Sequence, residues 1–138
     1  MSKALPPQLL PVRVYYEDTD FSGVVQHVAY LRFFERGRTE FLRARGINQS
    51  VLFAAGAPLV FSVRKMSVDY VKPALMDDEL CVETSVTKIG GASIEMAQRI
   101  LRGEEVLTLA HVRIAAVAAG KAQRLPSAIL AGLGGNGS

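Results

Sequence analysis

The sequence predicts an α+β fold in which an antiparallel sheet surrounds one long helix. Three observations support this: residues 27–45 carry apolar side chains at helical spacing, later segments alternate apolar and polar residues, and short turns join those segments. Consecutive strands joined by short turns pair as antiparallel neighbours, and one amphipathic helix then covers a face of their sheet. The chain has 138 residues and is expected to form a single domain over residues 12–126.

The N-terminal part of the chain is expected to form one strand followed by two helices. A strand begins at Val12 and continues through Tyr16 and Glu17, where apolar and polar residues alternate, after a loose lead-in over residues 1–11 that contains three prolines. The long helix spans residues 27–45, because Gly46 is a typical residue just beyond a helix end. A short second helix is expected over residues 48–55.

Four strands follow the helices. They are expected over residues 59–71, 79–88, 93–101 and 106–117. The last of them is almost continuously apolar, which predicts a central or an interface position. Residues 127–138 are expected to form a flexible, glycine-rich tail.

A glycine in the middle of the helix predicts a close contact. Gly37 costs about 1 kcal/mol relative to alanine, so we expect another backbone or a partner subunit to approach the helix there. An edge strand of so small a sheet would be exposed, and pairing of edges between subunits would cover it. Both points predict a homo-oligomer, either a dimer or a tetramer.

The composition argues against several classes of protein. The net charge is +3 and the basic residues are spread along the chain, which suits an anionic small molecule better than a nucleic acid. No stretch approaches the ~20 apolar residues that a membrane-spanning helix needs, and the first residues lack a signal-peptide pattern. The one cysteine, Cys81, is expected to be a buried thiol in a reducing compartment. We therefore expect a cytoplasmic protein.

The segment before the helix combines two carboxylates, Asp18 and Asp20, with a glycine, Gly23. A carboxylate in a loop beside a helix N-terminus can act as a general base or as a nucleophile, although it can also simply cap the turn or the helix. No Ser, Thr, Asp or Asn directly precedes Val28, so free N–H groups over residues 26–28 can bind a developing oxyanion. The segment therefore predicts a hydrolytic site centred on Asp20.

The neighbouring residues leave other roles open. Asp18 is expected to hold the turn, because two close carboxylates raise each other's pKa. His27 can be a base, a metal ligand or a helix-start residue. Asp18, Asp20 and His27 together offer metal ligands, but the sequence has no His-x-x-x-His pair and no cysteine cluster. A Gly-x-Ser-x-Gly motif is also absent, so we expect no serine nucleophile, and without those ligand patterns we expect no metal.

Two segments carry a resemblance to a known family. The first reads Tyr16-Glu-Asp-Thr-Asp20-x-x-Gly23-Val-Val-x-His27-x-x-Tyr30 and continues through Glu35 and Arg38 to Glu40, and the second spans residues 63–80. Together they closely resemble the 4-hydroxybenzoyl-CoA thioesterase-like hotdog proteins, most of all the acyl-CoA thioesterases associated with the Tol-Pal system of Gram-negative bacteria. The resemblance covers the chain from about Val12 to Val117.

This resemblance implies a hotdog fold, assembly into dimers or tetramers, and thioester hydrolysis without metal or cofactor. It implies that Asp20 is the nucleophile or the general base, and that a backbone N–H at or next to His27 polarises the carbonyl. The substrate would be an acyl group on coenzyme A or on acyl carrier protein. Candidate substrate-binding residues are Tyr16, Gly23, Val24, Val25 and Tyr30, with candidate phosphate contacts at Arg64, Lys65, Lys88 and Arg102.

Two alternatives stay open beside the thioesterase. One is a hotdog dehydratase, which typically uses a histidine paired with a carboxylate. The other is a non-catalytic module that binds acyl thioesters or acyl carrier protein; it would keep the pocket and show no turnover.

Overall fold

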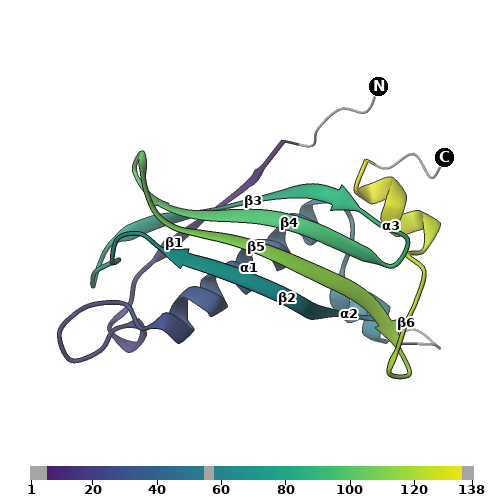
Figure 1. Cartoon of the computed structure of the whole chain (residues 1–138), viewed down its shortest axis with the longest axis horizontal. Coiled ribbons are helices and arrows are strands. Elements are labelled where there is room, and N and C mark those ends of the chain that lie inside the picture. The colour runs from purple at the N-terminus through teal and green to yellow at the C-terminus, as the bar shows by residue number, and fades with distance from the viewer. Residues whose placement is uncertain (1–5, 55–57, 135–138) are drawn as a thin grey trace.

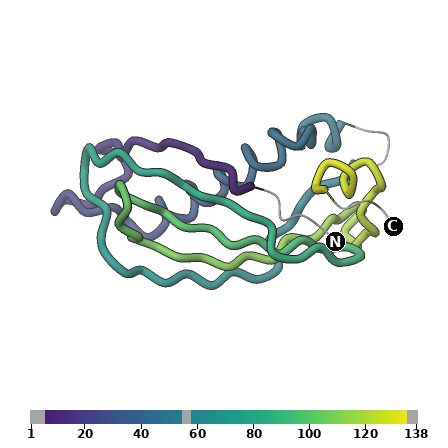
Figure 2. Tube along the Cα trace, turned by 90° about the horizontal axis from the view of Figure 1, so that it is seen from above, coloured from purple at the N-terminus to yellow at the C-terminus, as the bar shows by residue number. Residues whose placement is uncertain are grey.

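One long helix lies against one face of a curved antiparallel sheet (Figures 1 and 2). This computed structural model describes residues 6–54 and 58–134, and within them the sheet has six strands. The helices are α1 (His27–Ala44), α2 (Gln49–Phe53) and α3 (Ser127–Gly132). The strands are β1 (Gln8–Arg13), β2 (Val60–Tyr70), β3 (Glu79–Ile89), β4 (Ser93–Arg102), β5 (Glu105–Ala118) and β6 (Lys121–Ala122).

The strand order is β1-β3-β4-β5-β2, with every neighbouring pair antiparallel and β6 added at the end of β5. The predicted α+β class, with a sheet against one long helix, is therefore confirmed. The apolar strand β5 lies inside the sheet, between β4 and the edge strand β2, in line with the predicted central or interface position. The edges are β1 and β2, and β2 exposes apolar side chains at Val60, Val63 and Tyr70.

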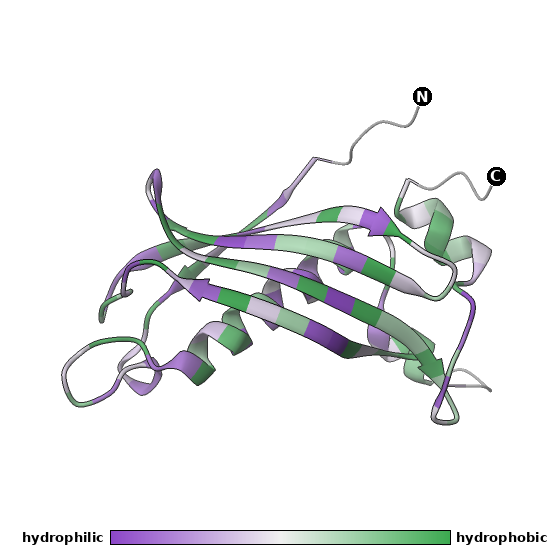
Figure 3. Cartoon of the chain, in the orientation of Figure 1, coloured by the Kyte–Doolittle hydropathy of each residue, from purple (hydrophilic) through white to green (hydrophobic). Residues whose placement is uncertain are grey.

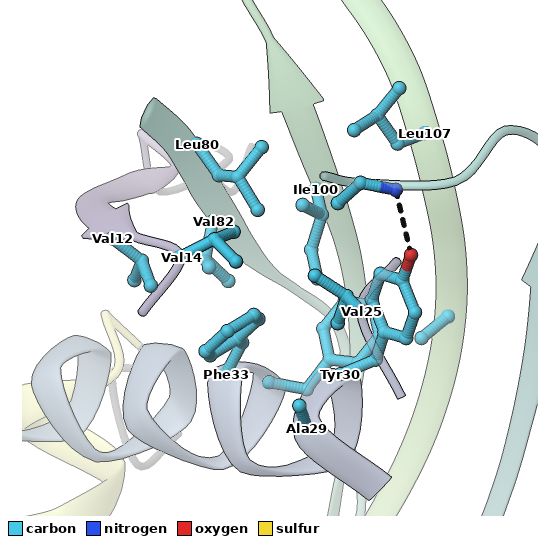
Figure 4. Close-up of a cluster of buried hydrophobic side chains, with 13 residues drawn as sticks. Val12, Val14, Val25, Ala29, Tyr30, Phe33, Leu80, Val82, Ile100 and Leu107 are labelled. Carbon is cyan, nitrogen blue, oxygen red and sulfur yellow. Dashed lines mark hydrogen bonds between the residues drawn. The ribbon is translucent and has the colours of Figure 1, made fainter. Parts of the chain in front are cut away.

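The helix packs on the sheet because both elements are apolar on the sides that meet. Along β4 and much of β5, more buried and more exposed residues alternate, so one face of these strands is buried; Figure 3 shows polar and apolar residues interspersed along them. Along α1, the buried residues recur at helical spacing, and three phenylalanines, Phe33, Phe34 and Phe41, are fully buried. Figure 4 shows Phe33 and Tyr30 of α1 directed toward Val82 and Ile100 of the sheet.

Gly37 marks the closest approach of α1 to the sheet. A Cβ added there would lie 2.7 Å from Val82 Cγ1 and 2.8 Å from Thr84 Oγ1. The predicted close contact is thus present, but its partners are side chains of β3 and β4 rather than a backbone. Gln98 fills the adjacent space and donates hydrogen bonds to Thr84 Oγ1 and to the carbonyl of Phe34, each at 2.9 Å.

The structure corrects three predicted segments. The first strand begins at Gln8, inside the predicted lead-in, because Pro11 is tolerated on an edge strand. Residues 16–18, which were expected to continue that strand, form a 3-10 turn instead. The predicted tail begins with α3, which buries Ile129 and, just beyond it, Leu133 in the core.

Two further expectations concern the end of the second helix and the absence of a membrane-spanning helix. The predicted end of the second helix, at residue 55, lies outside the described residues, and α2 ends at Phe53. Across the described part of the chain, no helix is both long and apolar enough to cross a membrane.

Candidate active site

The loop between the 3-10 turn and α1 is closed by hydrogen bonds across its base. Thr19 and Val25 form an antiparallel bridge, and the N–H of Asp20 donates to the carbonyl of Val24 at 2.9 Å. Gly23 adopts a φ of +82°, a conformation that favours glycine, and this allows the chain to turn within the loop. The loop therefore presents Asp20 from a fixed backbone at the left end of the molecule in Figure 1.

The carboxylate of Asp20 is exposed and accepts hydrogen bonds from its own loop. Its Oδ1 accepts from Ser22 Oγ at 2.6 Å, from the N–H of Ser22 at 2.8 Å and from the N–H of Val24 at 3.3 Å. These donors, the Ser22 hydroxyl above all, lower the pKa of Asp20 below its usual range. Asp20 is therefore a carboxylate at neutral pH, as both a nucleophile and a general base require.

Asp18 has a structural role, as predicted. Its side chain is buried, and Oδ2 accepts a hydrogen bond from the N–H of Tyr15 at 2.9 Å. Arg32 of α1 lies 3.6 Å from the other carboxylate oxygen. These contacts connect the 3-10 turn to the helix.

The N-terminus of α1 is not capped by a side chain of the described residues. Gln26 occupies the capping position, but its side-chain amide donates to the carbonyl of Thr19 at 2.9 Å. The N–H of Ala29 donates to the carbonyl of Gln26, which leaves the N–H groups of His27 and Val28 as the first-turn donors at the helix end. The positive end of the helix dipole adds to their attraction for an anion.

A cavity of about 190 Å³ lies beside this helix end. His27 stacks on Tyr70 with ring centroids 4.4 Å apart, and Tyr70 meets the edge of Tyr30 at 5.3 Å. The cavity is lined by Val24, Val25, His27, Tyr30, Tyr70, Val71, Lys72 and Pro73. Asp20 does not line the cavity, but its carboxylate accepts a hydrogen bond from the N–H of Val24, which does.

A second segment, residues 73–76, supports the loop. The N–H of Val25 donates to the carbonyl of Ala74 at 2.9 Å, and the N–H of Met76 donates to the carbonyl of Gly23 at 3.0 Å. The hydroxyl of Tyr30 accepts a hydrogen bond from the N–H of Ala74 at 2.9 Å (Figure 4). The chemistry-bearing loop, α1 and the segment after β2 are thus one hydrogen-bonded unit.

The structure brings only part of the predicted site together. Gly23, Val24, Val25, His27 and Tyr30 gather with Asp20, whereas Tyr16 lies in the 3-10 turn with 78% of its surface exposed. The predicted site also failed to include Tyr70, Lys72 and Pro73, which line the cavity. The second segment of the resemblance, residues 63–80, contains all three and was the signal that could have found them.

The predicted phosphate contacts lie elsewhere in the chain. Lys65 lines a separate hollow on the outer face of the sheet with His111 and Arg113, about 17 Å along β2 from Tyr70. Lys88 lies opposite Glu95 in the register of β3 and β4, in the same region. Arg64 lies beside Lys65 on β2, and Arg102 is bound by Asp78 and Glu105. Within one chain, none of these four cations lines the cavity, although Arg102 shares its partner Glu105 with Lys72, which does.

Among residues 6–54 and 58–134, no group of three or more His, Cys, Asp or Glu side chains is arranged to hold a metal ion. Cys81 is half-buried on β3, and burial raises the pKa of its thiol, so it is a poor nucleophile near neutral pH.

Comparison with known proteins identifies the class to which this fold and site belong. The sequence pattern of the thioesterase superfamily matches residues 22–109, and the chain belongs to that superfamily. Within it, the chain is similar to the acyl-CoA thioesterase YbgC of Haemophilus influenzae, with 48% identity over 111 residues, 80% of this chain and 81% of the relative. It is also 48% identical to the Escherichia coli acyl-CoA thioester hydrolase YbgC over 97 residues, 70% of this chain and 71% of the relative. The predicted family is confirmed.

Solved structures confirm the hotdog fold. A probable thioesterase from Bartonella henselae superposes with a TM-score of 0.84 at 46% identity, covering 87% of this chain and 99% of that one. A thioesterase from Thermus thermophilus, solved in complex with coenzyme A and Zn, gives a TM-score of 0.78 at 26% identity, covering 91% of this chain and 90% of that one.

The hydrogen bonds to Asp20 lead to a pH-dependent prediction. Ser22→Ala removes the closest donor to the carboxylate, so the pKa of Asp20 rises toward its usual value. Because only the ionised form of Asp20 could serve as a nucleophile or a general base, the acid limb of the kcat/KM profile is expected to shift to higher pH. The check is a pH–rate profile of both proteins, with Ser50→Ala, on exposed α2, as the control. An unshifted acid limb would show that this limb does not report Asp20.

Proposed function

We propose that this chain hydrolyses acyl-CoA thioesters, with Asp20 and the N-terminus of α1 performing the chemistry. One observation carries the proposal: the carboxylate of Asp20 is hydrogen-bonded to the backbone of Val24, and Val24 lines the same small, mostly apolar cavity as a helix N-terminus that no side chain of the described residues caps. The names of the YbgC relatives, acyl-CoA thioesterases in several bacteria, support the substrate class.

In this mechanism, the thioester carbonyl lies at the mouth of the cavity. Its oxygen accepts hydrogen bonds from the N–H groups of His27 and Val28, which stabilise the negative charge that develops during attack. The carboxylate of Asp20 either attacks the carbonyl carbon and forms an anhydride that water then cleaves, or removes a proton from the water that attacks directly. Both routes consume one water and release the acid and the thiol of coenzyme A. The side chains around the cavity contribute apolar contacts to the acyl group.

Both routes start from the ionised carboxylate, and the lowered pKa of Asp20 favours that form. In the alternative, dehydration, His27 would be the expected base. The imidazole of His27 stacks on the ring of Tyr70, whereas a dehydratase histidine is expected to pair with a carboxylate.

We further propose that the working unit is at least a dimer, paired through β2. This strand is eleven residues long, lies at the sheet edge and exposes Val60 and Val63. Such an edge is usually covered by another strand. Antiparallel pairing of two β2 strands over their full length would place the Val60 end of one strand beside the Tyr70 end of the other, so the partner chain would border the cavity that Tyr70 lines.

The measurement for this assembly is the mass in solution, by light scattering at micromolar protein. A dimer or a tetramer is the expected result, and Val63→Lys is expected to shift the equilibrium toward monomer by placing a charge on the pairing strand. A wild-type protein that stays monomeric at that concentration would contradict the proposal.

The carrier and the compartment are parts of the same proposal. The net charge of +3 and the single cysteine suit an anionic thioester substrate in a reducing cytoplasm. The Thermus thermophilus relative solved with coenzyme A supports that carrier, and acyl carrier protein is the alternative. We place no metal or cofactor in the reaction.

The experiment that tests this function is thiol release from a panel of acyl-CoA esters with short, long and aromatic acyl groups, with acyl carrier protein thioesters measured in parallel. Turnover on at least one ester is expected. Tight binding of the esters with no thiol release from any of them would favour the non-catalytic binding module instead.

A further inference from the structure

The hydroxyl of Tyr30 makes a contact that the proposed chemistry does not yet use. Tyr30 is 2% exposed, and its hydroxyl accepts a hydrogen bond from the N–H of Ala74, a residue that is itself fully buried (Figure 4). We propose that Tyr30 is a positioning residue, whose hydroxyl fixes the loop that carries Asp20 through the segment at residues 74–76. This inference rests on the proposed role of Asp20.

The connection runs through consecutive backbone hydrogen bonds. The N–H of Ala74 is held by Tyr30, while its carbonyl accepts from the N–H of Val25 at 2.9 Å. Leu75 then forms an antiparallel bridge with Val24, and the N–H of Met76 donates to the carbonyl of Gly23. Residues 74–76 therefore act as a short strand against residues 23–25 of the catalytic loop.

The last step reaches the carboxylate. The carbonyl of Val24 accepts the N–H of Asp20 at 2.9 Å, and the N–H of Val24 donates to Asp20 Oδ1 at 3.3 Å. A shift of Val24 would therefore move both the backbone and the carboxylate of Asp20. Because Tyr30 lies in the first turn of α1, its hydroxyl also ties the loop to the helix whose N-terminus would bind the oxyanion.

A purely hydrophobic role does not account for this hydroxyl. A phenylalanine would fill the same space in the core cluster, and the ring alone supplies the contact with Tyr70. The hydroxyl adds a partner for a backbone N–H that is otherwise shut off from water, and such groups are nearly always paired. Burial raises the pKa of Tyr30, so the phenol stays neutral and keeps the same hydrogen bond over the working range of pH.

The test compares Tyr30→Phe with wild type for kcat, for KM and for backbone amide hydrogen exchange. This substitution keeps the ring and removes only the hydrogen bond between the Tyr30 hydroxyl and the N–H of Ala74. We expect kcat to fall by about 10- to 100-fold, as for a small misplacement of reacting groups, while KM changes less than about threefold. Exchange of the Val25, Ala74 and Met76 amides is expected to accelerate, with the amides of β4 and β5 unchanged. Tyr15→Phe is the matched control, because Tyr15 is 62% exposed and lies outside the cavity.

Three outcomes would overturn the inference. Unchanged kcat in Tyr30→Phe would show that the hydrogen bond of the Tyr30 hydroxyl does not position Asp20. Faster exchange throughout the sheet would assign the effect to general loss of stability, and a rise in KM as large as the fall in kcat would assign it to weaker substrate binding. Asp20→Asn measured in the same assay separates the two proposals: if it retains full activity, the proposed function fails, whereas a collapse in Asp20→Asn with a fully active Tyr30→Phe overturns only the role of Tyr30.

Discussion

Asp20→Asn is expected to lower kcat for acyl-CoA hydrolysis by about 10²- to 10⁴-fold, the range typical of losing a positioned acid–base group. The amide keeps an oxygen that can accept from Ser22 and Val24, so the loop is expected to keep its fold. An amide can neither attack the carbonyl as a carboxylate does nor take a proton from water. KM is expected to change little, because the lining of the cavity is left intact.

The matched control is Asp69→Asn. Asp69 is also exposed but lies on β2, where it faces Leu109 of β5 on the outer surface of the sheet. It should retain wild-type kcat, and both variants should unfold at the wild-type temperature. If Asp20→Asn turned over substrate at the wild-type rate, the chemistry would have to lie elsewhere.

Gly37→Ala is expected to lower the free energy of unfolding by about 1–3 kcal/mol, the usual cost of overpacking a well-packed core. The new methyl would lie 2.7 Å from Val82 Cγ1 and 2.8 Å from Thr84 Oγ1, in a region where both neighbours are fully buried. Alanine gains about 1 kcal/mol over glycine in helix propensity, so a protein without this contact would be stabilised instead. The sign of the change, measured by chemical denaturation, therefore decides the point.

A second variant locates the cause of this destabilisation. Val82→Ala removes the atom nearest the added methyl and is expected to be destabilising alone, because it opens a cavity in the core. The double variant, Gly37→Ala with Val82→Ala, is expected to lose less stability than the sum of the two single changes. Strict additivity would show that the two positions do not interact.

Much of this fold follows from hydrophobic periodicity. The helix spacing of Phe33, Phe34 and Phe41 and the alternation along the later strands predict both the elements and the faces that meet, because burial of apolar surface dominates the packing. The central place of β5 follows from its continuous apolar run. Prediction was poorer where local backbone geometry decides the structure, as in the 3-10 turn at residues 16–18 and in β1.

The prediction of the site has the same strengths and gaps. Asp20, Gly23 and His27 are close together in sequence, so their proximity could be inferred directly. Tyr70 and the segment after it come to the cavity only because β2 ends beside α1, and no local pattern carries that information. Lys65 and Lys88 were chosen for their charge, whereas the strand register places them on the outer face of the sheet.

The most direct test of the central claim is a crystal structure of the Asp20→Asn variant with an unhydrolysed acyl-CoA bound. Our account predicts that the thioester oxygen lies about 2.7–3.1 Å from the backbone N–H groups of His27 and Val28. It also predicts that the carbonyl carbon lies about 3–3.5 Å from the substituted side chain at position 20. An acyl-CoA whose carbonyl points away from the N-terminus of α1, or that occupies the outer face of the sheet, would contradict the account.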